Sequence, residues 1–177
     1  MLEKVTWIGI FLLGSISYVH AQRPTGLRFH FSSGLPLAGE QNATYAVIHT
    51  AQLSYSHDLN EKWELWPQVA YVNAPYNRNF RLEGFQTLVG VRHQPTGKRL
   101  SYQFSVGAEY TKENYIFQFI EHQVTGSITN TGLLIRAGVD WPMVQHFQVH
   151  PFLEVIPAKR IMIGFSISYL MLKNESK

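Results

Sequence analysis

His30 and Ser32 are the residues whose types and spacing come closest to a catalytic pair. A serine hydroxyl becomes a nucleophile when a neighbouring base removes its proton, and strand residues at i and i+2 lie on the same face. The acidic partners available are Glu40, in the segment that follows, and Glu154, late in the chain. Neither has a spacing that ties it to the pair, so we predict that the protein is not an enzyme.

Other reactive residue types are scattered. The eight histidines are dispersed and there is no cysteine. No pair has the ligand spacing of a zinc site, so we predict neither a metal nor a cofactor. The net charge is only +3, and lysine and arginine form no run of the kind that marks nucleic-acid binding. The sequence therefore predicts no nucleic-acid partner.

The elements that position these residues are strands, because polar and apolar residues alternate with a period of two along most of the chain. The pattern is clearest at 100–111, where Leu100, Tyr102 and Phe104 alternate with Ser101, Gln103 and Ser105. It recurs at 27–32, 45–57, 63–71, 80–93, 133–141, 147–155 and 161–169. The sequence therefore predicts eight strands.

Four residues do not fit the simple alternation. The apolar parity changes near Gly84, which predicts a β-bulge there. Pro67 and Pro151 fall inside strands and lack a backbone N–H, so we expect local bulges at both. His49 lies on the apolar face of its strand. An interface between membrane and water would explain a histidine at that position.

Strand length and link length both indicate a membrane barrel. Most strands run about 9–13 residues, close to the ~9–11 that cross a bilayer when tilted. Long and short links alternate apart from the last, at 156–160, as external loops and periplasmic turns do. Residues 1–21 have a basic start, an apolar stretch and a small residue at Ala21. They predict a cleaved secretory signal peptide, followed by one barrel domain at 22–177.

The composition of the two faces indicates which way the barrel points. The polar face consists mostly of Ser, Gln, Gly and Thr, which fits a narrow interior better than a water-facing surface. The apolar face has aromatic residues toward both strand ends, as membrane interfaces require. They are Tyr55, Trp63, Tyr102, Trp141, Phe147 and Tyr169 at the short-turn end, and Phe31, Tyr45, Tyr71, Phe80 and Tyr110 at the other. The alternative is a soluble secreted carrier barrel of the lipocalin type, with the apolar face inside.

Charged residues on the polar face should pair, because an isolated charge in a dry interior is costly. An eight-stranded barrel has room inside for side chains but not for an open channel. We predict a salt-bridged network that fills the interior, formed by Arg28, Glu64, Arg81, Glu83, Arg92, Glu109, Arg136, Asp140, His150 and Glu154.

The longest link, 112–130, is more apolar than a solvated loop. Its apolar residues are Tyr115, Ile116, Phe117, Phe119 and Ile120. It could extend two strands above the membrane as a protruding sheet whose edge pairs with an extracellular protein. The alternative is that these side chains only pack on one another.

Two segments carry a family resemblance. Tyr55-Ser-His-Asp-Leu-Asn-Glu-Lys-Trp63 and Ile161-Met-Ile-Gly-Phe-Ser-Ile-Ser-Tyr169 resemble a hairpin and the last strand of small bacterial outer-membrane β-barrel proteins. The resemblance covers 27–172 as a pattern, and in that family the last strand commonly ends on an aromatic residue that the assembly machinery reads. Here Tyr169 is followed by eight further residues.

His30-Phe-Ser32 is also similar to the catalytic pair of outer-membrane lipid A deacylases, although in that family the pair lies late in the chain. We therefore keep a lipid-modifying hydrolase only as a minor alternative. The main prediction is an all-β protein, an eight-stranded antiparallel up-and-down transmembrane β-barrel in the bacterial outer membrane. We expect a monomer that contacts outer-membrane lipid and has a structural or surface-interaction role.

Overall fold

The computed structural model describes residues 26–39, 47–75, 80–95, 100–118, 122–144 and 146–173. The predicted signal peptide, Tyr45, Phe119 and Ile120 lie outside these residues. The described strands are β1 (Gly26–Ala38), β2 (Ile48–Asp58), β3 (Trp63–Pro75), β4 (Phe80–His93), β5 (Ser101–Gln118), β6 (Gln123–Val144), β7 (Phe147–Ile156) and β8 (Arg160–Lys173). Within the described residues, no helix is long and apolar enough to cross a membrane.

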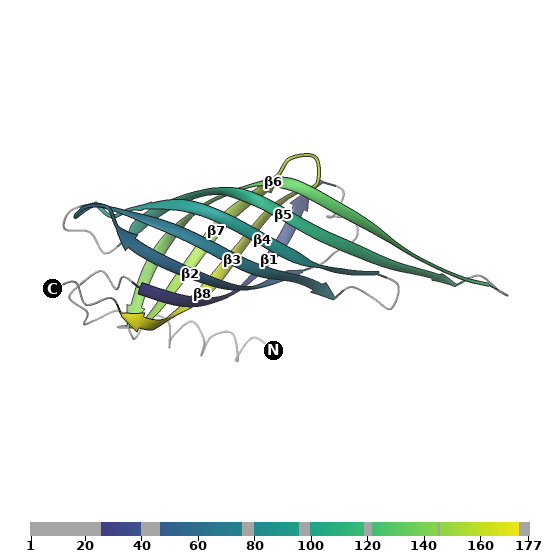
Figure 1. The fold of residues 1–177 in the computed structure, drawn as a ribbon, viewed down its shortest axis with the longest axis horizontal. Coiled ribbons are helices and arrows are strands. Elements are labelled where there is room, and N and C mark those ends of the chain that lie inside the picture. The colour runs from purple at the N-terminus through teal and green to yellow at the C-terminus, as the bar shows by residue number, and fades with distance from the viewer. Residues whose placement is uncertain are drawn as a thin grey trace, which may run out of the picture.

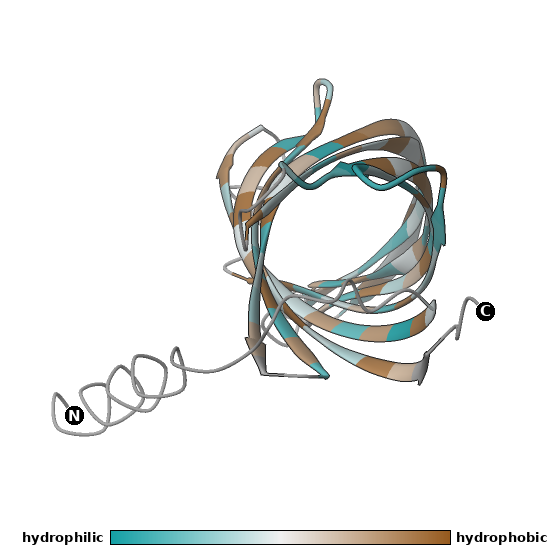
Figure 2. Ribbon diagram, turned by 90° about the vertical axis from the view of Figure 1, so that its left-hand side faces the viewer, coloured by the Kyte–Doolittle hydropathy of each residue, from teal (hydrophilic) through white to brown (hydrophobic). Residues whose placement is uncertain are grey.

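The eight strands form a closed antiparallel barrel in which each strand pairs with its sequence neighbours and β1 pairs with β8 (Figures 1 and 2). This confirms the predicted fold class. The end of the barrel at which β2 meets β3, β4 meets β5 and β6 meets β7 along the chain is called the turn end. At the other end β5 and β6 continue beyond the remaining strands (Figure 1), and we call it the hairpin end. The link predicted at 112–130 is therefore mostly strand.

The barrel wall has polar side chains inside and apolar side chains outside. Lumen-facing residues such as Arg28, Gln52 and Ser168 are at most 5% exposed, whereas outward residues such as Phe85 and Val89 are more than half exposed. All six aromatic residues predicted at the turn end point outward. Bands of both hydropathies alternate along the strands in Figure 2. The soluble carrier barrel, which needs the opposite arrangement, is excluded by this surface.

The bulge predicted at Gly84 is absent. Strand β4 pairs in unbroken register with β3 from Arg81 to His93 and with β5 from Phe80 to His93. Phe80 and Leu82 consequently face the lumen, and Phe80 is not part of an outer aromatic band. Leu82 packs there with Ile48, Val72, Ala74, Phe152 and Met162. The lumen thus has an apolar layer toward the hairpin end, which the sequence analysis did not predict.

The two prolines inside strands are accommodated without bulges. The β2–β3 pairing stops after Ser54↔Gln68 and resumes at His57↔Leu65 in the same register, which leaves a gap beside Pro67. The β6–β7 pairing has the same kind of gap beside Pro151, and both prolines remain paired on their other side. Since proline cannot donate a ladder hydrogen bond, a local gap replaces the bulge that we expected.

Candidate functional site

Buried charges near the turn end form one cluster inside the barrel. Arg92 Nη1 donates to Glu64 Oε2 at 2.8 Å, and Arg92 Nε lies 2.5 Å from Asp140 Oδ2. Asp140 also contacts His150 Nδ1. The Arg92 guanidinium lies 4.0 Å from the centre of the Trp66 ring, an additional cation–π contact. Arg28 is fully buried and lies within electrostatic range of Glu64 and Asp140.

A second cluster of charges lies farther toward the hairpin end. Glu154 accepts hydrogen bonds from Arg136 Nη2 at 2.5 Å and from Arg160 Nη2 at 2.6 Å. Arg160 also binds Glu109 through two nitrogens, at 2.6 and 3.1 Å. Arg160 was expected in the turn at 156–160 and is absent from the predicted network. Its position in the alternation could have identified it, because the even-numbered residues from 162 to 168 face the lumen and Arg160 continues that series.

Glutamine side chains connect the second cluster to the opposite wall. Arg136 donates to Gln52 Oε1 at 2.9 Å and to Gln86 Oε1 at 3.0 Å, and Gln52 donates to Gln68 at 2.7 Å. A pore wide enough for water would leave these side chains accessible, whereas each is at most 5% exposed. In the part of the chain that the structure describes, this arrangement can hold the wall together but offers no open path for solutes.

Two residues expected in the lumen lie elsewhere. Arg81 and Glu83 point outward, 61% and 36% exposed, and contact each other at 3.5 Å. They were expected inside because a bulge at Gly84 would have turned their side chains toward the lumen. With β4 regular, their odd positions face away from the lumen together with Phe85.

The predicted base and nucleophile do not contact each other. His30 Nε2 is hydrogen-bonded to Ser54 Oγ at 2.6 Å, and Ser32 Oγ is hydrogen-bonded to Thr50 Oγ1. Both side chains are at most 4% exposed inside the lumen. A substrate could not reach Ser32 there, so the structure does not support the hydrolase alternative at this pair.

A different serine–histidine pair lies on the outer wall. Ser33 on β1 is directly opposite His49 on β2, and Ser33 Oγ is 2.8 Å from His49 Nδ1. The His49 ring stacks on Phe31, with centroids 6.0 Å apart. This pair explains the outward histidine, and a sequence read strand by strand could not find it because the partners belong to different strands. No described residue makes a second hydrogen bond to His49, so no group orients it as a catalytic base requires.

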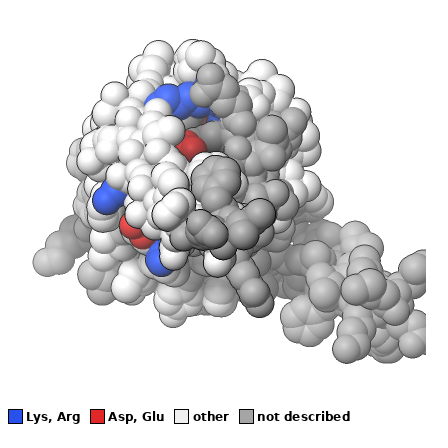
Figure 3. Space-filling view, turned by 90° about the vertical axis from the view of Figure 1, so that its right-hand side faces the viewer, with Lys and Arg blue, Asp and Glu red and all other residues white. Residues whose placement is uncertain are grey.

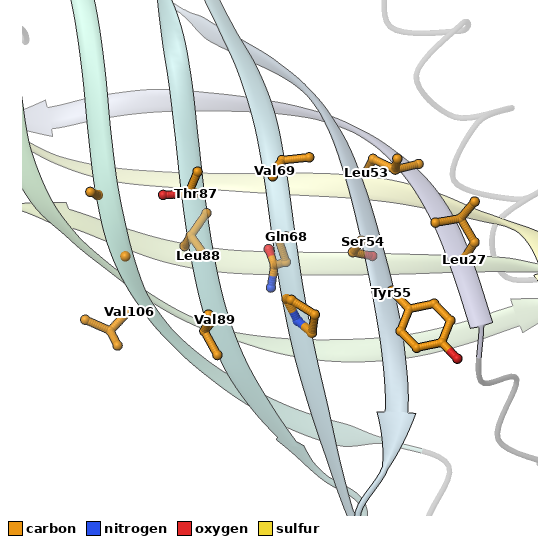
Figure 4. A pocket seen from close by; sticks show the side chains of 13 residues that line it. Leu27, Leu53, Ser54, Tyr55, Gln68, Val69, Thr87, Leu88, Val89 and Val106 are labelled. Carbon is orange, nitrogen blue, oxygen red and sulfur yellow. The ribbon is translucent and has the colours of Figure 1, made fainter.

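The outer wall also has shallow apolar grooves between side chains. Figure 4 shows one, of about 570 Å3, that runs across β1 to β5 and includes Leu27, Leu53, Val69, Thr87 and Val106. A second groove, of about 790 Å3, runs across β1, β8, β7 and β6 and includes Ser33. Among the described residues, no three potential ligands are arranged to hold a metal ion.

The hairpin end bears a strand edge without a neighbour. Pairing of β6 with β7 begins only at Ile135↔Val155, whereas pairing with β5 continues to Gln118↔Gln123. Residues 123–134 of β6 therefore have a neighbour on one side only among the described strands. In Figure 3, which looks onto this end, charged side chains form a few separate patches among uncharged ones.

No protein-family model and no curated protein sequence matches the chain. Solved structures do. The attachment invasion locus protein Ail of Yersinia pestis is 13% identical with a TM-score of 0.58, and the match covers 82% of this chain and 97% of that one. The N-terminal β-barrel domain of Pseudomonas aeruginosa OprF is 15% identical with a TM-score of 0.57, and the match covers 84% of this chain and 98% of that one. Neisserial surface protein A is 8% identical with a TM-score of 0.54, and the match covers 83% of this chain and 98% of that one.

These similarities establish the fold, which is that of small eight-stranded outer-membrane β-barrels. The apolar outer wall of this chain and the aromatic residues at its turn end agree with that fold. Together they place the barrel in a bacterial outer membrane.

Proposed function

We propose that this protein is a non-enzymatic outer-membrane barrel that interacts with an extracellular protein through the β5–β6 hairpin. The observation that carries the proposal is the open edge of β6 at 123–134. Backbone N–H and C=O groups at a strand edge have unused hydrogen-bonding capacity and can accept an additional strand. The filled lumen supports a role at the surface rather than in transport.

One contact identifies which backbone groups point to the open side. Lys159 Nζ donates to the carbonyl oxygen of Thr131 at 2.6 Å. Lys159 approaches β6 from the side away from β5, the same side on which β7 pairs with β6 nearer the turn end. The N–H and C=O of one strand residue point the same way, and successive residues alternate. The groups of Gln123, Thr125, Ser127 and Thr129 therefore face the open side, and those of the residues between them face β5.

The open edge lacks the features that usually prevent strand addition. Natural edges carry lysine, proline or bulges, which hinder pairing with another chain. Residues 123–134 contain no charged residue and no proline, and their pairing with β5 has no register shift. Lys159 covers only the membrane-proximal end of the edge.

The hairpin also presents apolar side chains next to this edge. Phe117 and Val124 are directly opposite each other and nearly half exposed, and Ile128 is 53% exposed. Phe117 packs edge-on against Phe80 with centroids 5.6 Å apart. Ail has been solved with sucrose octasulfate, a heparin analogue. An uncharged edge with apolar neighbours instead favours an extended polypeptide.

Deleting 114–127 tests the role of the hairpin. We expect cells that display the shortened barrel to lose adhesion to host cells or complement binding, measured against cells with the intact chain. The barrel should survive, because the membrane-spanning ladder lies below the deletion, and the heat-modifiable gel shift of the outer-membrane fraction would show this. If every adhesion and complement phenotype persisted, the proposed function would fail.

Ser127→Pro tests the edge itself. It removes an N–H that points to the open side, so the hairpin should remain paired while an added strand loses its partner. Ser127→Thr, which keeps the N–H, is the matched control and should bind as the parent chain does. A Ser127→Pro variant that still bound, beside a deletion that did not, would retain the hairpin as the site but reject strand addition.

A further inference from the structure

We propose that Ser33, His49 and the adjoining groove form a binding site for one ester-linked phospholipid on the outer wall of the barrel. The serine–histidine pair would donate a hydrogen bond to an ester carbonyl of the lipid, and one acyl chain would lie in the groove. This inference concerns the wall inside the membrane and is independent of the hairpin.

The pair lies within the apolar band rather than above it. On β1, Leu35 and Leu37 lie between Ser33 and the hairpin end, and each is 51% exposed on the outward face. Phe31 lies on the other side of Ser33, also outward. Both polar side chains are half-buried, so a lipid can reach them.

The offset between neighbouring strands also places the Ser33–His49 pair inside the apolar band. Directly paired residues lead from Ser33 through His49, Asn73, Glu83 and Lys112 to Thr129 on β6. Because the strands of a closed barrel are tilted, a line of directly paired residues moves along the barrel axis from strand to strand. After all eight strands it reaches β1 again about ten residues from where it began. This row climbs toward the hairpin end, which puts Glu83 and Lys112 near the interface and the serine–histidine pair deeper.

The hydrogen bond within the pair leaves one donor in either tautomer. If Nδ1 carries the proton and donates to Ser33 Oγ, the serine O–H remains available. If the serine donates to Nδ1, the protonated Nε2 remains available. No described residue accepts from this donor. An unsatisfied donor among acyl chains is costly, and the ester carbonyl is the acceptor that a phospholipid supplies nearest to its chains.

The groove beside Ser33 suits a hydrocarbon chain. Its volume of about 790 Å3 lies in the range of about 300–1,000 Å3 that is usual for small-molecule sites. Both small residues and larger apolar side chains line it, including Gly34, Ala137, Gly138, Leu153, Ile163 and Phe165. Since the wall faces the bilayer, an acyl chain is the occupant that its surroundings provide.

Native mass spectrometry of the folded full chain in detergent tests this site. The probe is phosphatidylethanolamine with two ester-linked palmitoyl chains, compared with its diether analogue, which lacks both carbonyls. We expect the first ester lipid to bind about tenfold more tightly than the first diether lipid, as the gain of one hydrogen bond predicts.

The double variant Ser33→Ala/His49→Phe should remove this preference, because it keeps an aromatic ring for Phe31 but loses the serine hydroxyl and both ring nitrogens, the possible donors of the pair. Ala137→Phe should fill the groove and weaken both lipids alike. Thr87→Val is the matched control, since it removes an outward polar group from the groove in Figure 4 and should leave the preference intact.

The gel shift on heating should show that every variant is folded. Equal binding of ester and diether lipids to the parent chain would overturn the proposal. So would a Ser33→Ala/His49→Phe double variant that kept the preference, or a Thr87→Val variant that lost it.

Discussion

Two serine–histidine contacts lie on opposite faces of the β1–β2 wall, and they have opposite surroundings. Inside, His30 is hydrogen-bonded to Ser54 at 2.6 Å and is 1% exposed. Outside, His49 is hydrogen-bonded to Ser33 at 2.8 Å and faces lipid. The residue types and the distances are nearly the same. The face of the strand, which changes with every residue, therefore decides what each contact can do.

The charged residues show the same contrast on a larger scale. Glu154 is fully buried between Arg136 and Arg160, whereas Glu83 is partly exposed and contacts Arg81 at 3.5 Å. Removing the buried Glu154 carboxylate leaves Arg136 without its carboxylate partner and Arg160 with Glu109 alone, whereas a solvated carboxylate can be replaced by water. The interior should therefore be sensitive to changes that the outer wall tolerates.

Glu154→Gln should have the largest effect on stability. It keeps the side-chain shape but removes the negative charge shared by Arg136 and Arg160, so we expect a loss of about 3–5 kcal/mol in the free energy of unfolding. Glu83→Gln is the matched change on the outer face and should cost less than about 1 kcal/mol. Urea unfolding in lipid vesicles, followed by tryptophan fluorescence, measures both. Equal losses would remove the distinction between the two faces.

Sequence alone was sufficient for the strand count, the closed barrel and the outward direction of most apolar residues, because a period of two directly reports a two-faced strand. It was insufficient where the lumen itself is apolar. Phe80 and Leu82 were assigned to the lipid side on hydropathy, and the bulge inferred at Gly84 then turned Arg81 and Glu83 inward. Parity identifies two faces but cannot say which one is inside when both are apolar.

Contacts between strands were the other missing information. His30 and Ser32 were expected to form a pair because they are close in the chain, but their partners Ser54 and Thr50 come from the next strand. Arg160 was missed because the strand boundary was placed one residue too late. Register across strands depends on turn lengths and barrel stagger, and local patterns do not specify these to a single residue.

The two histidines provide a second, smaller test of the comparison. His30→Phe leaves the buried Ser54 hydroxyl without its partner, so we expect a loss of about 1–3 kcal/mol in the free energy of unfolding. His49→Phe places an aromatic side chain against lipid and should change stability by less than about 1 kcal/mol. The same vesicle unfolding experiment applies. A His49→Phe variant as unstable as His30→Phe would show that the outer pair supports the fold rather than a ligand.

The adjacent residues Ser32 and Ser33 compare the inner and outer faces of β1 most directly. Their side chains are chemically identical, and they differ only in the face to which they point. Ser32→Ala leaves the buried Thr50 hydroxyl without its hydrogen bond and should cost about 1 kcal/mol. Ser33→Ala removes a hydroxyl from the lipid face, where an apolar methyl group is at least as favourable, so stability should stay within about 0.5 kcal/mol. The sign of the difference between the two variants is more informative than either value, because unfolded-state effects are the same for both. If Ser33→Ala proved the more costly change, lipid exposure of this wall would have to be reconsidered.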